Sequence, residues 1–162
     1  DGDNSLAPLL IDALNSSSNE ESIRNYLGHV LREKAYGRYS IEQEGELADG
    51  KRTDLRFIGT KCDSPVPVEL KLADNWPGPK CVERLVNQLC GDYLRDRRSS
   101  RGIFLLVNHV NPRHWKIPGH DALCTFPELV AALQAHWESI KSNHSNIDHI
   151  DVIGIDLTAR SG

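Results

Sequence analysis

An unbroken run of apolar residues near the middle of the chain places the strongest constraint on its fold. The run I-F-L-L-V at positions 103–107 contains no polar side chain. Such a run is typical of a strand that is buried on both faces of its sheet. The strand expected from Gly102 to Val110 therefore predicts a sheet that is covered by helices on both sides.

The periodicity of apolar residues predicts the elements on either side of this strand. Helical spacing of apolar residues predicts helices, whereas alternation of apolar and polar residues predicts strands. The expected elements are, in chain order, a helix that ends near Gly37, strands at 39–47, 52–58 and 65–72, a helix that ends near Leu94, the strand at 102–110, a helix at 126–140 and a strand at 150–157. The order α-β-β-β-α-β-α-β predicts an α/β fold in which helices flank a mixed β-sheet.

Length and composition place the chain among ordinary globular domains. The 162 residues are expected to form a single domain, and the absence of methionine suggests that this domain was excised from a longer protein. No apolar run is long enough to span a membrane, so no membrane partner is expected. The four cysteines form no C-x-x-C pair, which favours reduced thiols in a cytoplasmic protein.

The strands at 39–47 and 52–58 are expected to form a hairpin. They flank Asp49-Gly50, a dipeptide that favours a two-residue turn. With that turn, Gly45 would lie opposite Asp54 and leave open space beside its carboxylate.

Two acidic residues interrupt strands that are otherwise largely apolar, namely Asp54 in T-D-L-R-F and Glu69 in V-P-V-E-L-K-L. Burial of a carboxylate is costly unless it is paired or binds a metal ion. Lys71 follows Glu69 by two residues, so both side chains emerge from one face of the strand, opposite the valines and leucines.

Two carboxylates and one amine suit phosphodiester hydrolysis. Carboxylates are hard oxygen ligands for Mg²⁺, which polarises the phosphate and makes a bound water more acidic. Lys71 can orient or deprotonate that water, or neutralise charge that develops in the transition state. A cross-strand ion pair, in which Lys71 only neutralises Asp54 or Glu69, explains the same spacing and stays open.

Residues 21–107 resemble the PD-(D/E)xK nuclease superfamily, which has the restriction-endonuclease-like fold. The resemblance rests on a leading helix, Asp54 on the second strand, Glu69-Leu70-Lys71 on the third, and Gln88 in the helical segment N-Q-L-C-G-D-Y-L before the strand G-I-F-L-L-V. It implies that Asp54, Glu69 and the Leu70 carbonyl bind Mg²⁺, for which Mn²⁺ can substitute. It also implies that Lys71 is the catalytic lysine and that Gln88 positions water or phosphate.

The sequence departs from the superfamily pattern at two positions. Thr53 stands where the superfamily name places proline, and Gln88 and Tyr93 are farther apart than is usual, which weakens the role of Gln88. Some members add a glutamate from the first helix. Glu20 and Glu21 stand at that place, although helix capping is the simpler role for them.

The formal net charge of −4 means that nucleic-acid binding must depend on a local basic cluster. The expected phosphate contacts are Arg95, Arg97, Arg98 and Arg101, and a solvated polar loop is the alternative interpretation. Trp76, just after the third strand, is the expected base-stacking residue, although tryptophans more often fill a core.

Two further polar groups permit more than one interpretation. Glutamates alternate along the first strand and are expected to line a solvent face, unless one of them reaches the metal; these are Glu42, Glu44 and Glu46. A second group has metal-binding side chains but matches no common zinc finger, so a loop that approaches substrate is preferred over a zinc site; it comprises His109, His114, His120 and Cys124.

Together these features predict a Mg²⁺-dependent endo- or exonuclease, with DNA favoured over RNA as its nucleic-acid partner. By analogy, the domain is expected to belong to, or assemble with, a larger defence or restriction protein, and a homodimer is left open. The alternatives are a non-catalytic nucleic-acid-binding module on the same fold and a small α/β interaction domain.

Overall fold

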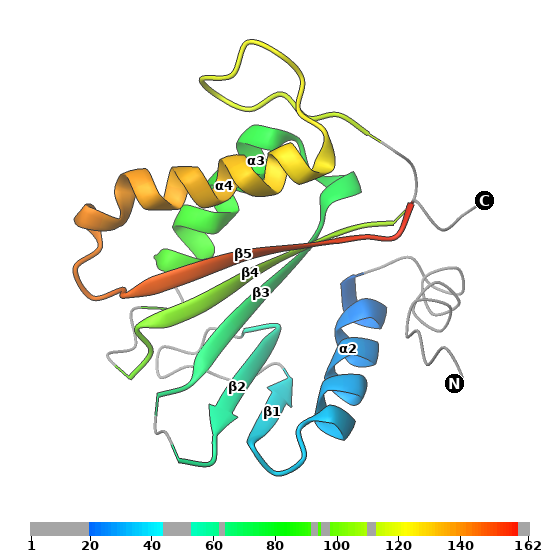
Figure 1. Cartoon of the computed structure of the whole chain (residues 1–162), viewed down its shortest axis with the longest axis vertical. Coiled ribbons are helices and arrows are strands. Elements are labelled where there is room, and N and C mark those ends of the chain that lie inside the picture. Colours follow the sequence, from blue (N-terminus) through cyan, green and yellow to red (C-terminus); the bar gives the residue numbers. More distant parts are fainter. Residues whose placement is uncertain are drawn as a thin grey trace.

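A single mixed sheet with helices on both faces organises the part of the chain that the structure describes (Figure 1). The computed structural model describes residues 20–43, 53–61, 64–91, 94, 98–109 and 113–158. Within these ranges the elements are α2 (Glu20–Lys34), β1 (Tyr39–Gln43), β2 (Leu55–Gly59), β3 (Val66–Leu72), the 3-10 turn η1 (Ala73–Asn75), α3 (Gly78–Arg84), the π-helix η2 (Leu85–Cys90), β4 (Arg101–Asn108), α4 (Phe126–Ile140), the 3-10 turn η4 (Lys141–Asn143) and β5 (His149–Asp156). The predicted order of helices and strands is confirmed.

The sheet has the strand order β1-β2-β3-β4-β5. The pairs β1–β2 and β2–β3 are antiparallel, whereas β3–β4 and β4–β5 are parallel. The prediction of a mixed sheet is therefore confirmed. No helix in the described ranges is both long and apolar enough to cross a membrane.

The two faces of the sheet carry separate cores. α2 covers one face, where Ile23 packs with Leu70 and Val107, among others. α3, η2 and α4 cover the opposite face, where Phe104 and Leu106 are buried (Figure 1). Residues of the apolar run thus alternate between the two cores, as a strand buried on both faces must.

The register of the hairpin differs from the predicted one by a single residue. Gln43 pairs with Leu55, whereas a two-residue turn at Asp49-Gly50 would place Glu44 opposite Leu55. The predicted pairing of Gly45 with Asp54 does not fit this register, and Gly45 and the turn themselves lie outside the described residues. A shift of one residue requires a different connection length, which the strand pattern alone does not determine.

A regular helix was expected after Trp76, but only the first part of this segment is α-helical. α3 ends at Arg84 and continues as the π-helix η2, whose wider turn appears in the hydrogen bond from the Gly91 N–H to the Val86 carbonyl at 3.0 Å. A Cβ atom on Gly91 would lie 2.5 Å from the Asn87 carbonyl oxygen, so the backbone packs too closely there for a side chain. The apolar stripe survives the change of pitch, since Leu85 and Leu89 are both fully buried.

Candidate active site

The predicted acidic residues lie where β2 and β3 separate. The β2–β3 ladder runs from Phe57↔Val66 to Leu55↔Val68, while β3 continues beside β4 as far as Leu72. The pair Leu55↔Val68 is the last of this ladder. Asp54 precedes Leu55 and Glu69 follows Val68, so the two acidic residues occupy the next positions opposite each other. The two carboxylates are thus cross-strand neighbours at the end of the antiparallel ladder.

The predicted division of β3 into two faces is confirmed. Val68 and Leu70 belong to the core beneath α2. Glu69 and Lys71 pair with Phe104 and Leu106 on the opposite face of the sheet. Glu69 has no exposed surface and Lys71 is only 8% exposed, so both charged groups are largely removed from water.

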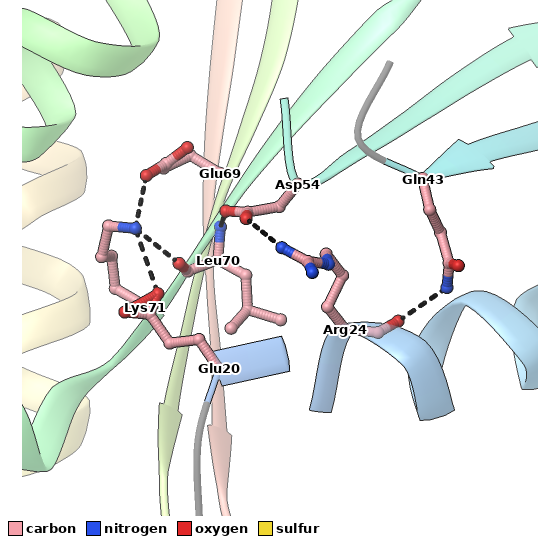
Figure 2. A network of polar contacts seen from close by, with 7 residues as sticks. All are labelled: Glu20, Arg24, Gln43, Asp54, Glu69, Leu70 and Lys71. Atoms are coloured by element: carbon pink, nitrogen blue, oxygen red, sulfur yellow. Dashed lines mark hydrogen bonds and ion pairs between the residues drawn. The ribbon is translucent and has the colours of Figure 1, made fainter. Parts of the chain in front are cut away.

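The Lys71 ammonium lies among three oxygen atoms from three different sources (Figure 2). Lys71 Nζ is 2.6 Å from Glu69 Oε1, 3.0 Å from the Leu70 carbonyl oxygen and 3.1 Å from Glu20 Oε2. The contacts with Leu70 and Glu20 are hydrogen bonds, and the contact with Glu69 is an ion pair. The arrangement brings together the predicted lysine, the predicted glutamate and the predicted carbonyl ligand.

The surrounding carboxylates determine the charge of Lys71. Burial lowers the pKa of Lys71, but the nearby Glu69, Glu20 and Asp54 carboxylates together raise the pKa above its ordinary value. Lys71 is therefore a cation at neutral pH in this arrangement.

Glu20 enters the site from the first turn of α2. Sequence analysis gave helix capping as its simpler role, but the structure places its carboxylate against Lys71. The helix that covers the other face of the sheet thus contributes a third acidic side chain at the point where the strands separate.

Asp54 is held by one bond to the backbone and one to a cation. Its Oδ2 accepts a hydrogen bond from the Leu70 N–H at 2.8 Å, and its Oδ1 lies 3.4 Å from Arg24 Nη1 (Figure 2). Arg24 also belongs to α2, one turn after Glu20. Sequence analysis did not single out Arg24, although its spacing of four residues from Glu20 predicts that both side chains share one helix face.

The position of α2 is fixed in part by Gln43 at the end of β1. Gln43 Nε2 donates to the Arg24 carbonyl at 3.2 Å and lies 3.4 Å from the Asn25 carbonyl oxygen. A Cβ atom on Gly28 would lie 2.1 Å from Gln43 Nε2, so glycine permits this close approach of helix and strand. These contacts position the helix that carries Glu20 and Arg24.

The oxygen atoms at this site fit the chemistry of a hard divalent cation. Asp54, Glu69, Glu20 and the Leu70 carbonyl supply carboxylate and carbonyl oxygens, which Mg²⁺ and Mn²⁺ prefer. With the side chains as they stand, however, no three His, Cys, Asp or Glu side chains in the described ranges form a group that could hold a metal ion. The cations of Lys71 and Arg24 contact these same oxygens, so a divalent cation would have to share or replace them.

Gln88 and Trp76 lie on the side of the sheet that α3 and η2 cover. Gln88 Oε1 accepts a hydrogen bond from Arg84 Nη1 at 3.2 Å. The Arg84 guanidinium carbon lies 4.8 Å from the centroid of the Trp76 ring, which packs at the edge of the core. Trp115 and Trp137 are buried, as tryptophans that fill a core are.

Along β4, Arg101 lies away from the position of Lys71. Arg101 is exposed at the start of β4, whereas Lys71 pairs with Leu106 farther along that strand. Arg101 and Leu106 are five residues apart on β4, which corresponds to about 17 Å along the strand. Arg101 lines a shallow cavity of about 390 Å³ together with residues 64–66 and Ser100. Arg98 is also described, while Arg95 and Arg97 lie outside the described residues.

The other polar candidates have local partners. Glu42 pairs with Arg56 at 2.8 Å on the β1–β2 hairpin, and Glu44 and Glu46 lie outside the described residues. His109 Nδ1 lies 2.6 Å from Asp74 Oδ2. Cys124 is buried, and its backbone pairs with that of Trp115. His114 directly precedes Trp115, and His120 lies between Trp115 and Cys124.

Comparison with known proteins identifies no relative of this chain. No model of a protein family matches it, and neither does any curated protein or solved structure. The chemistry of the site is therefore argued from its own geometry.

Proposed function

We propose that this protein is a Mg²⁺-dependent nuclease with a restriction-endonuclease-like fold, and that it hydrolyses phosphodiester bonds of nucleic acid, with DNA favoured over RNA. The observation that carries the proposal is the convergence of charged groups from three elements. Lys71 lies 2.6 Å from Glu69 on the same strand and 3.1 Å from Glu20 on α2, while Asp54 flanks Glu69 across the strand junction.

Asp54, Glu69 and the Leu70 carbonyl would hold the divalent cation, with Glu20 as an additional carboxylate. The bound ion would polarise the phosphate and acidify a water molecule. A carboxylate that is fully buried, as Glu69 is, requires a cation beside it. Both Lys71 and a divalent ion meet that requirement.

Lys71 would act as a cation and not as a base. Its pKa is raised above the ordinary value by the surrounding carboxylates, so its ammonium keeps its proton at neutral pH. A protonated lysine can orient a nucleophilic water through its lone pairs and can stabilise negative charge on the phosphate in the transition state.

Nucleic acid would extend from the acidic residues toward the arginine cluster. Arg98 and Arg101 would contact phosphates distant from the bond that is cut, together with Arg95 and Arg97 of the same run. Gln88, which lies on η2, would position water or phosphate. Trp76 already packs against Arg84, so a base would have to stack beside that pair or displace the guanidinium.

The ion pairs themselves favour one alternative, an interaction domain in which the charges are purely structural. Each charged side chain of the site forms an ion pair with a side chain of opposite charge; the pairs are Glu69–Lys71, Glu20–Lys71 and Asp54–Arg24. A network of this kind needs no metal ion and no nucleic acid. A non-catalytic module on the same fold would instead bind nucleic acid without cutting it.

One panel of assays separates these three functions. Labelled single- and double-stranded DNA and RNA are incubated with the protein in Mg²⁺, Mn²⁺ or a chelator. Cleavage that requires the metal, is lost in Lys71→Ala and is kept in Lys80→Ala supports the nuclease. Lys80 is a suitable control because it pairs with Glu83 on the exposed face of α3. Binding without cleavage indicates the module, and neither activity indicates the interaction domain.

By analogy with the superfamily, we also propose that the domain acts in the cytoplasm as the effector part of a larger defence or restriction protein. A homodimer remains compatible with this role.

A further inference from the structure

The arrangement of charges on α2 points to a substrate contact that the sequence did not indicate. We propose that Arg24 is a phosphate-binding residue of this site, and that Asp54 holds the guanidinium in place until a divalent cation and nucleic acid bind. The inference rests on the proposed nuclease function and deepens it.

Arg24 and Glu20 act as a pair across the strand junction. They lie one turn apart on α2, and each reaches a residue of opposite charge, Asp54 for Arg24 and Lys71 for Glu20 (Figure 2). The helix α2 thus contributes one anionic and one cationic side chain to the same site. Because Gln43 bonds to the Arg24 carbonyl, the backbone from which this arginine extends is fixed.

The ion pair between Arg24 and Asp54 is the longest of the three ion pairs described at the site. Its atoms are 3.4 Å apart, whereas Lys71 and Glu69 are 2.6 Å apart and charge-assisted bonds typically measure about 2.7–2.9 Å. The Arg24 and Asp54 side chains are 15% and 17% exposed, so solvent and ligands can reach them. The tight bond of Asp54, from the Leu70 N–H to Oδ2, is independent of Arg24. A cation that binds Asp54 therefore competes with Arg24 for Oδ1 alone.

The balance of charge explains why Arg24 would bind a phosphate once a divalent cation has bound to Asp54. Among the described residues, three carboxylates and two cations meet here, which leaves one negative charge in excess. A divalent cation reverses that balance to one positive charge, which a phosphodiester group neutralises. Lys71 is already surrounded by three oxygen atoms, whereas guanidinium has a planar fork of donors that matches phosphate oxygens. Arg24 is thus the cation of the site best suited to a phosphate.

The test compares Arg24→Gln with Arg32→Gln. Arg32 lies two turns farther along the same helix, where it is exposed and bonds to the Ile41 carbonyl. Replacement of either arginine by glutamine removes one positive charge, so the two variants have the same net charge. Eight helical residues place it about 12 Å from Arg24, beyond the usual screening length of about 8 Å. Arg24→Lys is the third variant, because it keeps the charge and removes the fork.

Two readouts are measured for each variant, and neither requires cleavage. The first is Mn²⁺ affinity by calorimetry, and the second is binding of short labelled oligonucleotides in Ca²⁺ over a range of salt, with gels to verify that they stay intact. Arg24→Gln should bind Mn²⁺ about tenfold more tightly, because a competing cation has gone. It should bind nucleic acid about tenfold more weakly. Its slope of log affinity against log salt should fall by about 0.9 for a duplex or 0.7 for a single strand.

Arg24→Lys should keep the salt slope but lose affinity, and Arg32→Gln should match the wild type in both readouts. An unchanged salt slope in Arg24→Gln, with metal-dependent binding by the wild type intact, overturns the role of Arg24 and leaves the nuclease proposal standing. Weaker Mn²⁺ binding by Arg24→Gln also overturns it, since that result marks Arg24 as structural support. A wild type that binds neither metal nor nucleic acid overturns both proposals.

Discussion

The backbone N–H of Leu70 donates a hydrogen bond of 2.8 Å to Oδ2 of Asp54. The carbonyl of the same Leu70 accepts a bond of 3.0 Å from Lys71. One residue of β3 therefore connects the acid and the lysine through its backbone, while its side chain is fully buried beneath α2. The position of both charged groups depends on where β2 and β3 separate, and several predictions about stability and chemistry can be drawn from that geometry.

Lys71→Ala should abolish cleavage and also destabilise the fold. Loss of a general acid–base or charge-stabilising group typically lowers the rate by about 10²–10⁴-fold. Sequence considerations alone suggest that folding would be largely unaffected. Glu69 has no exposed surface, however, and loses its ion pair at 2.6 Å. Removal of one partner from a buried ion pair typically costs about 3–5 kcal/mol, which urea unfolding at neutral pH would measure.

The double variant Lys71→Ala/Glu69→Gln serves as the control for that cost. It removes both charges of the buried ion pair between Lys71 and Glu69, so it should recover most of the lost stability while remaining inactive. Mg²⁺ should also raise the melting temperature of Lys71→Ala more than that of the wild type, because the ion replaces the missing positive charge. Equal stability of Lys71→Ala and wild type would show that Glu69 is not charged in the folded protein.

Asp54→Asn and Asp54→Ala should separate the structural role of Asp54 from its proposed chemical one. Asparagine keeps an oxygen that can accept the Leu70 N–H, so Asp54→Asn should unfold at nearly the same urea concentration as the wild type. Asp54→Ala leaves that N–H without its bond and should lose about 1–3 kcal/mol. Both variants should lose Mn²⁺ binding, measured by calorimetry, and cleavage. Retained metal binding in Asp54→Asn would remove this carboxylate from the ligand set.

Glu20→Gln should weaken Mn²⁺ binding and slow cleavage about tenfold, because a carboxylate near the ion is lost. The pKa of Lys71 should also fall, since Glu20 helps to raise it. Stability should change by only about 0–1 kcal/mol, as expected for a partly exposed pair. The exposed neighbour Glu21 provides a matched control, and Glu21→Gln should behave as the wild type in metal titration. Identical effects of the two variants would assign Glu20 to helix capping alone.

Stability should decline as pH rises above about 9 because of two buried thiols. Burial raises the pKa of Cys81 from 9.0 to about 11 and that of Cys90 from 9.0 to about 12. Between those values the unfolded chain releases protons that the folded protein keeps, so the free energy of unfolding falls as pH increases. Cys81 alone should contribute a loss of about 2 kcal/mol by pH 11.

The measurement is urea unfolding between pH 8 and 10. Cys81→Ala should show a shallower decline than the wild type over the same interval. A parallel decline would place the origin of the pH dependence in other groups.

Gln134→Ala should expose the edge of the sheet at β5. Gln134 on α4 donates to the Ile150 carbonyl at 3.0 Å and accepts from the Val152 N–H at 2.8 Å, so its amide occupies part of that edge. Its removal should cost about 1–2 kcal/mol and promote association through the unpaired strand. Light scattering would detect the association, and Ser139→Ala on the exposed side of α4 should remain unchanged. A Gln134→Ala protein with wild-type stability and mass would show that the amide does not protect this edge.

The sequence indicated most of the elements because their patterns are local. The helix Phe126–Ile140 has the predicted bounds, and its apolar spacing needs no partner to be recognised. Glu69 and Lys71 could be placed on one face of β3 because side chains alternate along any strand. The convergence of Asp54 with this pair also followed from the order of the strands.

Other features depended on contacts that no periodicity encodes. The π-helix at Leu85–Cys90 and the one-residue shift at Gln43↔Leu55 result from packing and connection length. Arg24 and Glu20 gained their positions from the angle at which α2 crosses the sheet. Arg101 was expected to contact phosphate as part of a cluster of arginines, and its distance from Lys71 along β4 became known only from the register of the strands.

The sequence by itself determined an α/β chain with a sheet covered on both faces and with Glu69 and Lys71 on one strand, whereas Asp54, expected on the neighbouring strand, lies one residue before β2. These properties follow from the alternation and spacing of side chains, which act over a few residues. Only the tertiary structure decided that α2 adds Glu20 to Lys71 and Arg24 to Asp54. Such pairings depend on how a helix and two separating strands pack together, and many sequences with the same local pattern would pack differently.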